Sequence, residues 1–292
     1  MKQLLILSGK GGTGKTTVAT ALIHLFEAKV FADCDVDAPN LHLMMHHHVL
    51  RDQRKFLGMD KAVITPTLCN ACGICQAHCR FAAIHENATT EKYEVNPFAC
   101  EGCGVCEYVC PVNAVTMVDS EVGTLSLYNG TRVFSTAQLN MGSGNSGLLV
   151  TEVKKRMKNA ADPEESIAII DGSPGIGCPV IASISGVDLV LIVTEPSLSG
   201  ISDLKRIVET AAGLNATLAV CVNQWDVSKE NTLNIETFCS ESNIPFLGKI
   251  PYDPAVVEAV NKGKSIVEID CLAGDAVRGI HQNIKQLLLM QS

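Results

Sequence analysis

The sequence contains the same cysteine pattern twice. Each copy has three cysteines separated by two residues and a fourth after three more, and each cysteine of the second copy follows its counterpart by 31 residues. Ala83 and Ala114, and Ile84 and Val115, keep the same offset. The regular spacing indicates an internal duplication that folds as two similar halves.

The spacing within each copy is typical of ligands to a [4Fe-4S] cluster. Cysteines separated by two residues can wrap three corners of one cubane, whereas zinc sites usually combine separate pairs of ligands. In the bacterial two-cluster ferredoxin pattern, the fourth cysteine of each run binds the other cluster. We therefore predict two [4Fe-4S] clusters, with a zinc ribbon as the alternative. The first ligand set is Cys69, Cys72, Cys75 and Cys110, and the second is Cys100, Cys103, Cys106 and Cys79.

The composition favours cysteines that bind metal in a reducing compartment. The chain has 292 residues, 13 cysteines, 47% hydrophobic residues and a formal charge of -8. The apolar run that ends at Leu7 is too short for a secretion signal, and no stretch approaches the roughly 18 apolar residues of a membrane span. We expect a cytoplasmic protein without a membrane anchor or a disulfide framework. The acidic balance argues against direct nucleic-acid binding.

The two cysteine runs differ at the residue after the fourth cysteine. Pro111 follows Cys110, but Arg80 follows Cys79. A guanidinium that points toward the nearby cluster would stabilise its more negative, reduced form and raise its midpoint potential. A solvated Arg80 is the alternative.

A glycine-rich loop near the start of the chain has the pattern of a phosphate-binding loop. It runs from Gly9 to Thr16, follows an apolar strand-like segment at 3–7, and precedes a helical pattern at 17–27. Its backbone N–H groups and the helix amino terminus can surround a phosphate. Lys15 should reach the β- and γ-phosphates of ATP, and the Thr16 hydroxyl should bind Mg2+. The predicted nucleotide contacts are Gly11, Gly12, Thr13, Gly14, Lys15, Thr16 and Thr17.

The same loop carries a second lysine, Lys10, near its start. With Lys10 and Lys15, it resembles the deviant Walker A motif of the MinD/ParA ATPases, a group that also holds the nitrogenase iron protein and the Mrp-type cluster carriers. The resemblance covers residues 1 to about 50 and about 120 to 292. It implies a homodimer with nucleotide at the interface, in which Lys10 contacts the phosphates of the partner subunit.

Two aspartate-bearing segments fit the same family. The strand-like segment at 30–32 leads into Asp33, Asp35 and Asp37, and the segment at 167–170 ends in Asp171. By resemblance, Asp35 positions the attacking water, with Asp33 and Asp37 as alternatives. Asp171 would hold Mg2+ through its water shell, and Gly175 would bring an N–H near the γ-phosphate.

Later segments alternate between strand and helix patterns, which favours an α/β fold with a mostly parallel sheet covered by helices on both faces. By resemblance, Asn223 contacts the purine, and Pro251 and Asp253 lie in a segment that closes over the ribose. Asp226 could instead accept hydrogen bonds from guanine, so GTP stays open. We expect ATPase parts at 1–60 and 120–292 and an inserted α+β ferredoxin domain at 61–119.

Three functions fit this combination. The preferred one is an ATP-hydrolysing enzyme in which nucleotide-driven dimer or switch changes control electron transfer through the two clusters to a redox or metallocluster partner. The alternatives are a MinD-like positioning or assembly switch with redox-sensing clusters, and an ATPase that assembles or delivers metalloclusters. Cys178 lies at an offset from Asp171 similar to that of a cluster ligand in the nitrogenase iron protein, but we prefer a small buried residue at the start of a helix. We also favour packing or solvated histidines at His42 and in the run at 46–48.

Overall fold

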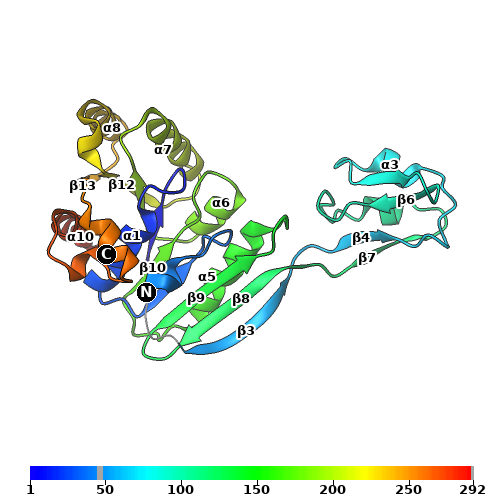
Figure 1. Ribbon diagram of the computed structural model, residues 1–292, viewed down its shortest axis with the longest axis horizontal. Helices are drawn as coiled ribbons and strands as arrows, with labels where there is room; N and C mark the ends of the chain where they lie inside the picture. The colour runs from blue at the N-terminus through cyan, green and yellow to red at the C-terminus, as the bar shows by residue number, and fades with distance from the viewer. Residues whose placement is uncertain (45–48, 291–292) are drawn as a thin grey trace. The chain divides into compact units, whose positions relative to one another are not determined.

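The computed structural model describes residues 1–44 and 49–290, so the histidine run at 46–48 lies outside the described residues. Within these ranges, nine strands form one sheet in the order β13-β12-β11-β1-β10-β2-β9-β8-β3 (Figure 1). Every neighbouring pair from β13 to β9 is parallel, which confirms the predicted sheet type. The strands are β1 (Lys2–Leu7), β2 (Val30–Asp33), β3 (Leu50–Leu57), β8 (Glu121–Asn129), β9 (Val133–Leu139), β10 (Ile167–Asp171), β11 (Leu189–Thr194), β12 (Thr217–Asn223) and β13 (Phe246–Ile250).

Helices cover the sheet because its central strands are apolar on both faces. In β1, Leu4 and Ile6 pack in one cluster with residues of α1 and α10. Leu5 and Leu7 are equally buried and point to the opposite face, as alternation along a strand requires. The helices are α1 (Lys15–Leu25), α2 (Leu41–Met44), α5 (Ser146–Ala160), α6 (Cys178–Ile184), α7 (Leu198–Ala211), α8 (Lys229–Glu241), α9 (Ala255–Asn261) and α10 (Leu272–Met290), with 3-10 turns η1 (Trp225–Val227) and η2 (Ile266–Glu268).

None of the helices described has both the length and the apolar content needed to cross a membrane.

The chain divides into two compact units. Unit 1 contains Met1–Gln53, Leu125–Gln138 and Gly147–Ser292, and unit 2 contains Arg54–Thr124 and Leu139–Ser146. The expected insert at 61–119 falls inside unit 2, which is larger and also takes in the glycine-rich segment after β9. Strands β3, β8 and β9 contribute residues to both units, β9 only through Leu139 in unit 2.

Unit 2 repeats one structural pattern twice, as the cysteine spacing implies. The first copy contains β4 (Lys61–Ile64), α3 (Ile74–His78) and β5 (Ile84–Asn87), and the second contains β6 (Lys92–Val95), α4 (Val105–Tyr108) and β7 (Val115–Val118). The antiparallel pairs are β4 with β7 and β5 with β6. The first strand of the first copy therefore pairs with the last strand of the second, and the two inner strands pair with each other.

Candidate functional site

The phosphate-binding loop lies between the carboxyl end of β1 and the start of α1. Gly12 and Gly14 have φ values of 82° and 88°, a region that favours glycine. A Cβ added to Gly14 would lie 2.4 Å from Asn223 Nδ2, so this position is restricted by space as well as by conformation. Asn223 Nδ2 in turn donates to Thr13 O at 2.8 Å. The loop is thus anchored to the end of β12.

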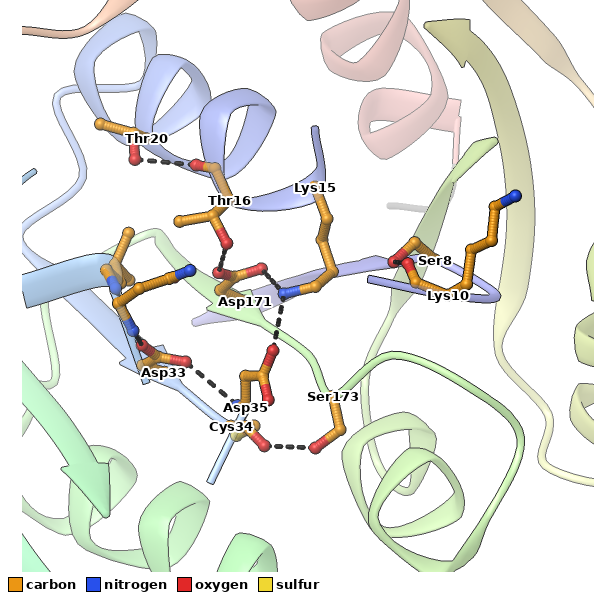
Figure 2. A network of polar contacts seen from close by, with 12 residues as sticks. Ser8, Lys10, Lys15, Thr16, Thr20, Asp33, Cys34, Asp35, Asp171 and Ser173 are labelled. Carbon is orange, nitrogen blue, oxygen red and sulfur yellow. Dashed lines mark hydrogen bonds and ion pairs between the residues drawn. The ribbon is translucent and has the colours of Figure 1, made fainter. Parts of the chain in front are cut away.

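Lys15 and Thr16 converge on Asp171 at the end of β10 (Figure 2). Lys15 Nζ lies 2.5 Å from Asp171 Oδ1, and Thr16 Oγ1 donates to Asp171 Oδ2 at 2.7 Å. Burial alone would lower the pKa of Lys15, but the charge of Asp171 and its hydrogen bond outweigh burial and raise that pKa. The hydroxyl and carboxylate oxygens that the sequence assigned to Mg2+ therefore lie side by side, and oxygen ligands are those that Mg2+ prefers.

Asp33 and Asp35 occupy different environments at the end of β2. Asp33 is fully buried and accepts the backbone N–H groups of Asp35, Asn40 and Leu41, each at 3.0 Å. Burial, reinforced by the charge of Asp171, raises the pKa of Asp33 to about 7. Asp35 is partly exposed, and its Oδ2 lies 3.9 Å from Lys15 Nζ. Asp33 therefore fixes the loop, while Asp35 faces the lysine that was expected to bind phosphate.

The side chain of Lys10 points away from this network (Figure 2). Its ammonium lies 2.7 Å from Glu195 Oε1 and donates to Ser199 Oγ at 2.8 Å. The hydrogen bond from Lys10 lowers the pKa of Glu195. Both partners of Lys10 lie nearly 200 residues further along the chain, so no local sequence pattern connects them to the loop.

A cavity of about 270 Å3 adjoins the phosphate-binding loop, and its walls include Gly12, Thr17 and Asn223. Apolar side chains of α9 and η2, among them Val256, Val260 and Ile266, form part of the lining. Pro251 and Asp253 are not among the lining residues within the described chain. The Asp253 carboxylate instead accepts the N–H groups of Ala255 and Ala273 at 3.0 and 3.2 Å.

Asp226, the residue that left GTP open, has a structural contact. Its Oδ1 accepts the backbone N–H of Tyr252 at 2.7 Å. The carboxylate therefore holds the segment that follows β13, and Asp226 is not among the described residues that line the cavity.

Unit 2 contains two small cavities, each lined by four cysteines. The first is lined by Cys69, Cys72, Cys75 and Cys110, and the second by Cys79, Cys100, Cys103 and Cys106. These sets coincide with the two crossed ligand sets predicted from the sequence. Among the described residues, no three histidine, cysteine, aspartate or glutamate side chains are arranged around one metal ion.

The backbone around the two cavities follows the duplication. Positive φ occurs at equivalent positions of the two copies: Ala71 and Gly102, Gly73 and Gly104, and Ala82 and Asn113. The N–H groups of Ala83 and Ala114 donate to Cys79 Sγ and Cys110 Sγ at 3.4 and 3.2 Å. Hydrogen bonds to ligand sulfurs are among the features that tune iron–sulfur clusters. Arg80 is exposed, which agrees with the alternative of a solvated side chain.

Two lysines of unit 2 were overlooked in the sequence. Lys61 Nζ donates to the carbonyl oxygen of Cys100, and Lys92 Nζ donates to that of Cys69 at 2.7 Å. The two lysines are themselves 31 residues apart, the offset of the cysteine runs. That offset was the signal that could have found them.

Cys178 begins α6, as expected, but it is exposed, so the expectation of a buried packing residue is wrong. A Cβ added to Gly147 of α5 would lie 3.2 Å from the Cys178 carbonyl oxygen. His42 is exposed on α2. Neither residue belongs to a group of metal-binding side chains in the part of the chain that the structure describes.

Comparison with known proteins agrees with the geometry of unit 1. A model of the CobQ/CobB/MinD/ParA nucleotide binding domain matches residues 4–266. The uncharacterized protein MJ0578 of Methanocaldococcus jannaschii is 30% identical, over 98% of this chain and 97% of its own. The septum site-determining protein MinD of Helicobacter pylori is 23% identical, over 96% of this chain and 88% of its own.

Among solved structures, the septum site-determining protein MinD from Pyrococcus horikoshii, complexed with Mg-ADP, has a similar fold. The TM-score is 0.56 at 18% identity, and the match covers 100% of this chain and 98% of that one. With the family match over most of its length, the chain belongs to the CobQ/CobB/MinD/ParA family of nucleotide-binding domains.

Proposed function

We propose that this protein is an ATPase that couples nucleotide binding and hydrolysis to electron transfer through two [4Fe-4S] clusters. The observation that carries the proposal is the pair of cavities in unit 2, each lined by one of the crossed sets of four cysteines. Unit 1 of the same chain contains the phosphate-binding loop with Lys15, Thr16 and Asp171. One polypeptide thus carries both a nucleotide site and the ligands of an electron relay.

ATP with Mg2+ is the proposed nucleotide. Lys15 would exchange its contact with Asp171 for the β- and γ-phosphates, and Thr16 would turn its hydroxyl to the ion. The complex of Pyrococcus horikoshii MinD with Mg-ADP supports this reading. Asp226 is engaged by Tyr252 N–H, which supports adenine over guanine because guanine recognition would need a free carboxylate.

Hydrolysis would require Asp35 and a second subunit. Asp35 is partly exposed beside Lys15, so its carboxylate is available to orient a water at the γ-phosphate. Lys10 is held by Glu195 and Ser199, away from the Lys15 of its own chain. That orientation supports a role for Lys10 toward the nucleotide of a partner copy in a homodimer.

The cysteine cavities fit the proposed clusters in ligand type, number and backbone support. When bound, each cluster supplies reversible one-electron chemistry. The chain's own part is to hold the cluster with four thiolates and to direct N–H groups of Ala83 and Ala114 at two of the sulfurs. The proposed acceptor is a redox or metallocluster protein.

A covalent route connects unit 2 to the nucleotide site. The last residues of unit 2 are held by Asn145, whose Oδ1 accepts the N–H of Met59 at 2.5 Å. Helix α5 begins at the next residue, Ser146. Its Lys154 donates to Ala182, Ser183 and Ser185 carbonyls at the end of α6 at 3.1, 2.6 and 2.7 Å.

Helix α6 follows directly on the loop that leaves Asp171. A shift of that loop on nucleotide binding would therefore move α6 and α5 together. Because the chain passes from unit 2 directly into α5, such a motion would link the nucleotide state of unit 1 to the clusters of unit 2.

The test is anaerobic purification of the full chain, followed by iron and sulfide analysis and by ATPase assays of oxidised and reduced protein. The proposal expects about eight irons per chain, reversible low-potential reduction, and nucleotide-dependent reduction of an acceptor that stops in Lys15→Ala. Iron-free protein with full ATPase activity would refute the electron-transfer part.

A MinD-like switch is the second candidate, favoured by the similarity to Helicobacter pylori MinD over 96% of this chain. It predicts nucleotide-dependent self-association or partner binding that proceeds without net electron flow. Light scattering with ATP or ADP, on reduced and oxidised protein, separates the two candidates.

A further inference from the structure

In each cysteine cavity of unit 2, one lysine donates to the backbone carbonyl of a lining cysteine. That lysine comes from the other half of the duplication. Lys61 begins β4 of the first copy and contacts the carbonyl of Cys100, the first cysteine of the second run. Lys92 begins β6 of the second copy and contacts the carbonyl of Cys69, the first cysteine of the first run. Lys61 is buried and Lys92 is half-buried.

The two contacts are equivalent under the pseudo-twofold symmetry of the unit. The N–H of Thr65 donates to Ala114 O at 2.8 Å, and the N–H of Asn96 donates to Ala83 O at 2.7 Å. These backbone contacts follow the two lysines by four residues and also cross from one copy to the other. The lysine positions are thus part of the repeated architecture and not two unrelated surface contacts.

We propose that Lys61 and Lys92 are positioning cations that set the reduction potentials of the two clusters, one lysine for each cluster. The inference rests on the proposed iron–sulfur function. Cys100 belongs to the second ligand set and Cys69 to the first, so Lys61 serves the second cluster and Lys92 the first.

The physical reason is electrostatic. Reduction adds a negative charge to a cluster that four thiolates already make anionic. An ammonium on the main chain of a ligand stabilises the reduced form and raises the midpoint potential. Because Lys61 is only 9% exposed, water screens its charge less than it screens the exposed Arg80.

The two cavities also differ in one charge. Glu101 lines the second cavity, and Asn70, its counterpart 31 residues earlier, lines the first. The carboxylate opposes Lys61, whereas nothing equivalent opposes Lys92 at that position.

A purely structural role is the competing explanation, because each lysine also ties one half of unit 2 to the other. Charge and hydrogen bonding can be separated by substitution. Lys61→Gln and Lys92→Gln keep a donor but remove the charge, and Lys61→Arg and Lys92→Arg keep the charge. Lys55→Gln is the matched control, since Lys55 is an exposed lysine of the same unit that pairs with Glu121 at 2.6 Å.

The experiment is a redox titration of the anaerobically prepared full chain with dithionite, followed by electron paramagnetic resonance, with iron and sulfide measured in every sample. Lys61→Gln should shift one midpoint potential to a more negative value, and Lys92→Gln should shift the other. The arginine variants and Lys55→Gln should titrate as the wild type does. Glu101→Gln should raise the potential that Lys61→Gln lowers, and Asn70→Asp should lower the one that Lys92→Gln lowers, which assigns each wave to its cavity.

Unchanged potentials in iron-replete glutamine variants would overturn the inference. So would equal shifts in the arginine and glutamine variants. If a glutamine variant loses its iron, the methionine variant at the same position is titrated instead. Loss of iron in both neutral variants, with the arginine variant intact, would make the lysine structural and also overturn the inference. An iron-free wild type is a different result, because it refutes the proposed function and leaves no cluster to tune.

Discussion

The ammonium of Lys15 lies 2.5 Å from the carboxylate of Asp171, and both side chains are almost completely buried. A buried charge is costly unless it is paired, so each residue stabilises the other before any ligand arrives. A phosphate that enters the loop must compete with Asp171 for this lysine. Nucleotide binding therefore requires Lys15 to leave Asp171, the expected Mg2+ ligand, and to contact the phosphates instead.

Lys15→Ala should abolish tight ATP binding, because it removes the cation of the loop and leaves Asp171 unpaired. Titration with a fluorescent ATP analogue measures the loss. Lys10→Ala is the control: its ammonium points away from the loop of its own chain. It should keep ATP binding and lose hydrolysis, and loss of binding in this variant would contradict the role assigned to Lys10.

Asp35→Ala should bind ATP nearly as the wild type does and hydrolyse it at least about 100-fold more slowly, since the general-base or water-positioning contribution is removed. Phosphate release and equilibrium binding are measured on the same preparation. Asp37, exposed two residues later, provides the comparison. Equal losses of hydrolysis rate in Asp35→Ala and Asp37→Ala would contradict the assignment of water positioning to Asp35 alone.

Asp33 should make the nucleotide-free protein less stable as pH rises. Its pKa is about 7 in the folded chain and 3.8 as the ordinary value, so the folded state keeps a proton that the unfolded state releases. The stabilisation is complete below the unfolded pKa and is lost as pH rises through the folded one. Urea unfolding between these two values should show the decline, and Asp33→Asn should reduce it. A slope that persists unchanged in this variant would assign the pH dependence to another group.

Cys100→Ala should lose about half of the bound iron, because one of the two ligand sets is broken. The thermal transition of unit 1 should remain. Cys178→Ala, at an exposed position outside both cavities, should keep its full iron content. Iron loss in the Cys178 variant alone would transfer the ligand role to that residue.

Lys154→Met should weaken the connection between α5 and α6 by removing three hydrogen bonds to carbonyl groups. The expected destabilisation is about 1–3 kcal/mol. ATP binding should persist, while the effect of ATP on the cluster spectra should decrease. Lys155→Met is the control, since Lys155 is exposed and lies 3.8 Å from Glu152 on the same helix. A full ATP effect in Lys154→Met would exclude this route.

The parts of the fold that follow local rules were predictable. The segment before Gly9, the glycine loop and the helix at Lys15 form a contiguous signal. The 31-residue offset identified the two cysteine runs, and the ferredoxin pattern gave the crossed sets of four that line the cavities. The contact between Lys10 and Glu195 could not be read from the sequence, because it depends on how β11 lies beside β1.

The function of a single residue was harder to predict where its side chain can bind either a ligand or a backbone N–H group. Asp253 and Asp226 were both considered as nucleotide contacts, yet each accepts backbone N–H groups in the structure. A carboxylate that follows a strand looks the same in both cases. Only the tertiary structure shows which donor lies within hydrogen-bonding distance of the carboxylate.

The exchange of strands between the two copies in unit 2 has a consequence for evolution and for engineering. Because β4 pairs with β7 and β5 with β6, each strand of one copy has its pairing partner in the other copy. Cutting the unit down to one copy would strip a fourth cysteine from the surviving cavity and expose strand edges at the same time. A simplified protein with one cubane must therefore keep both copies and delete ligands, not segments.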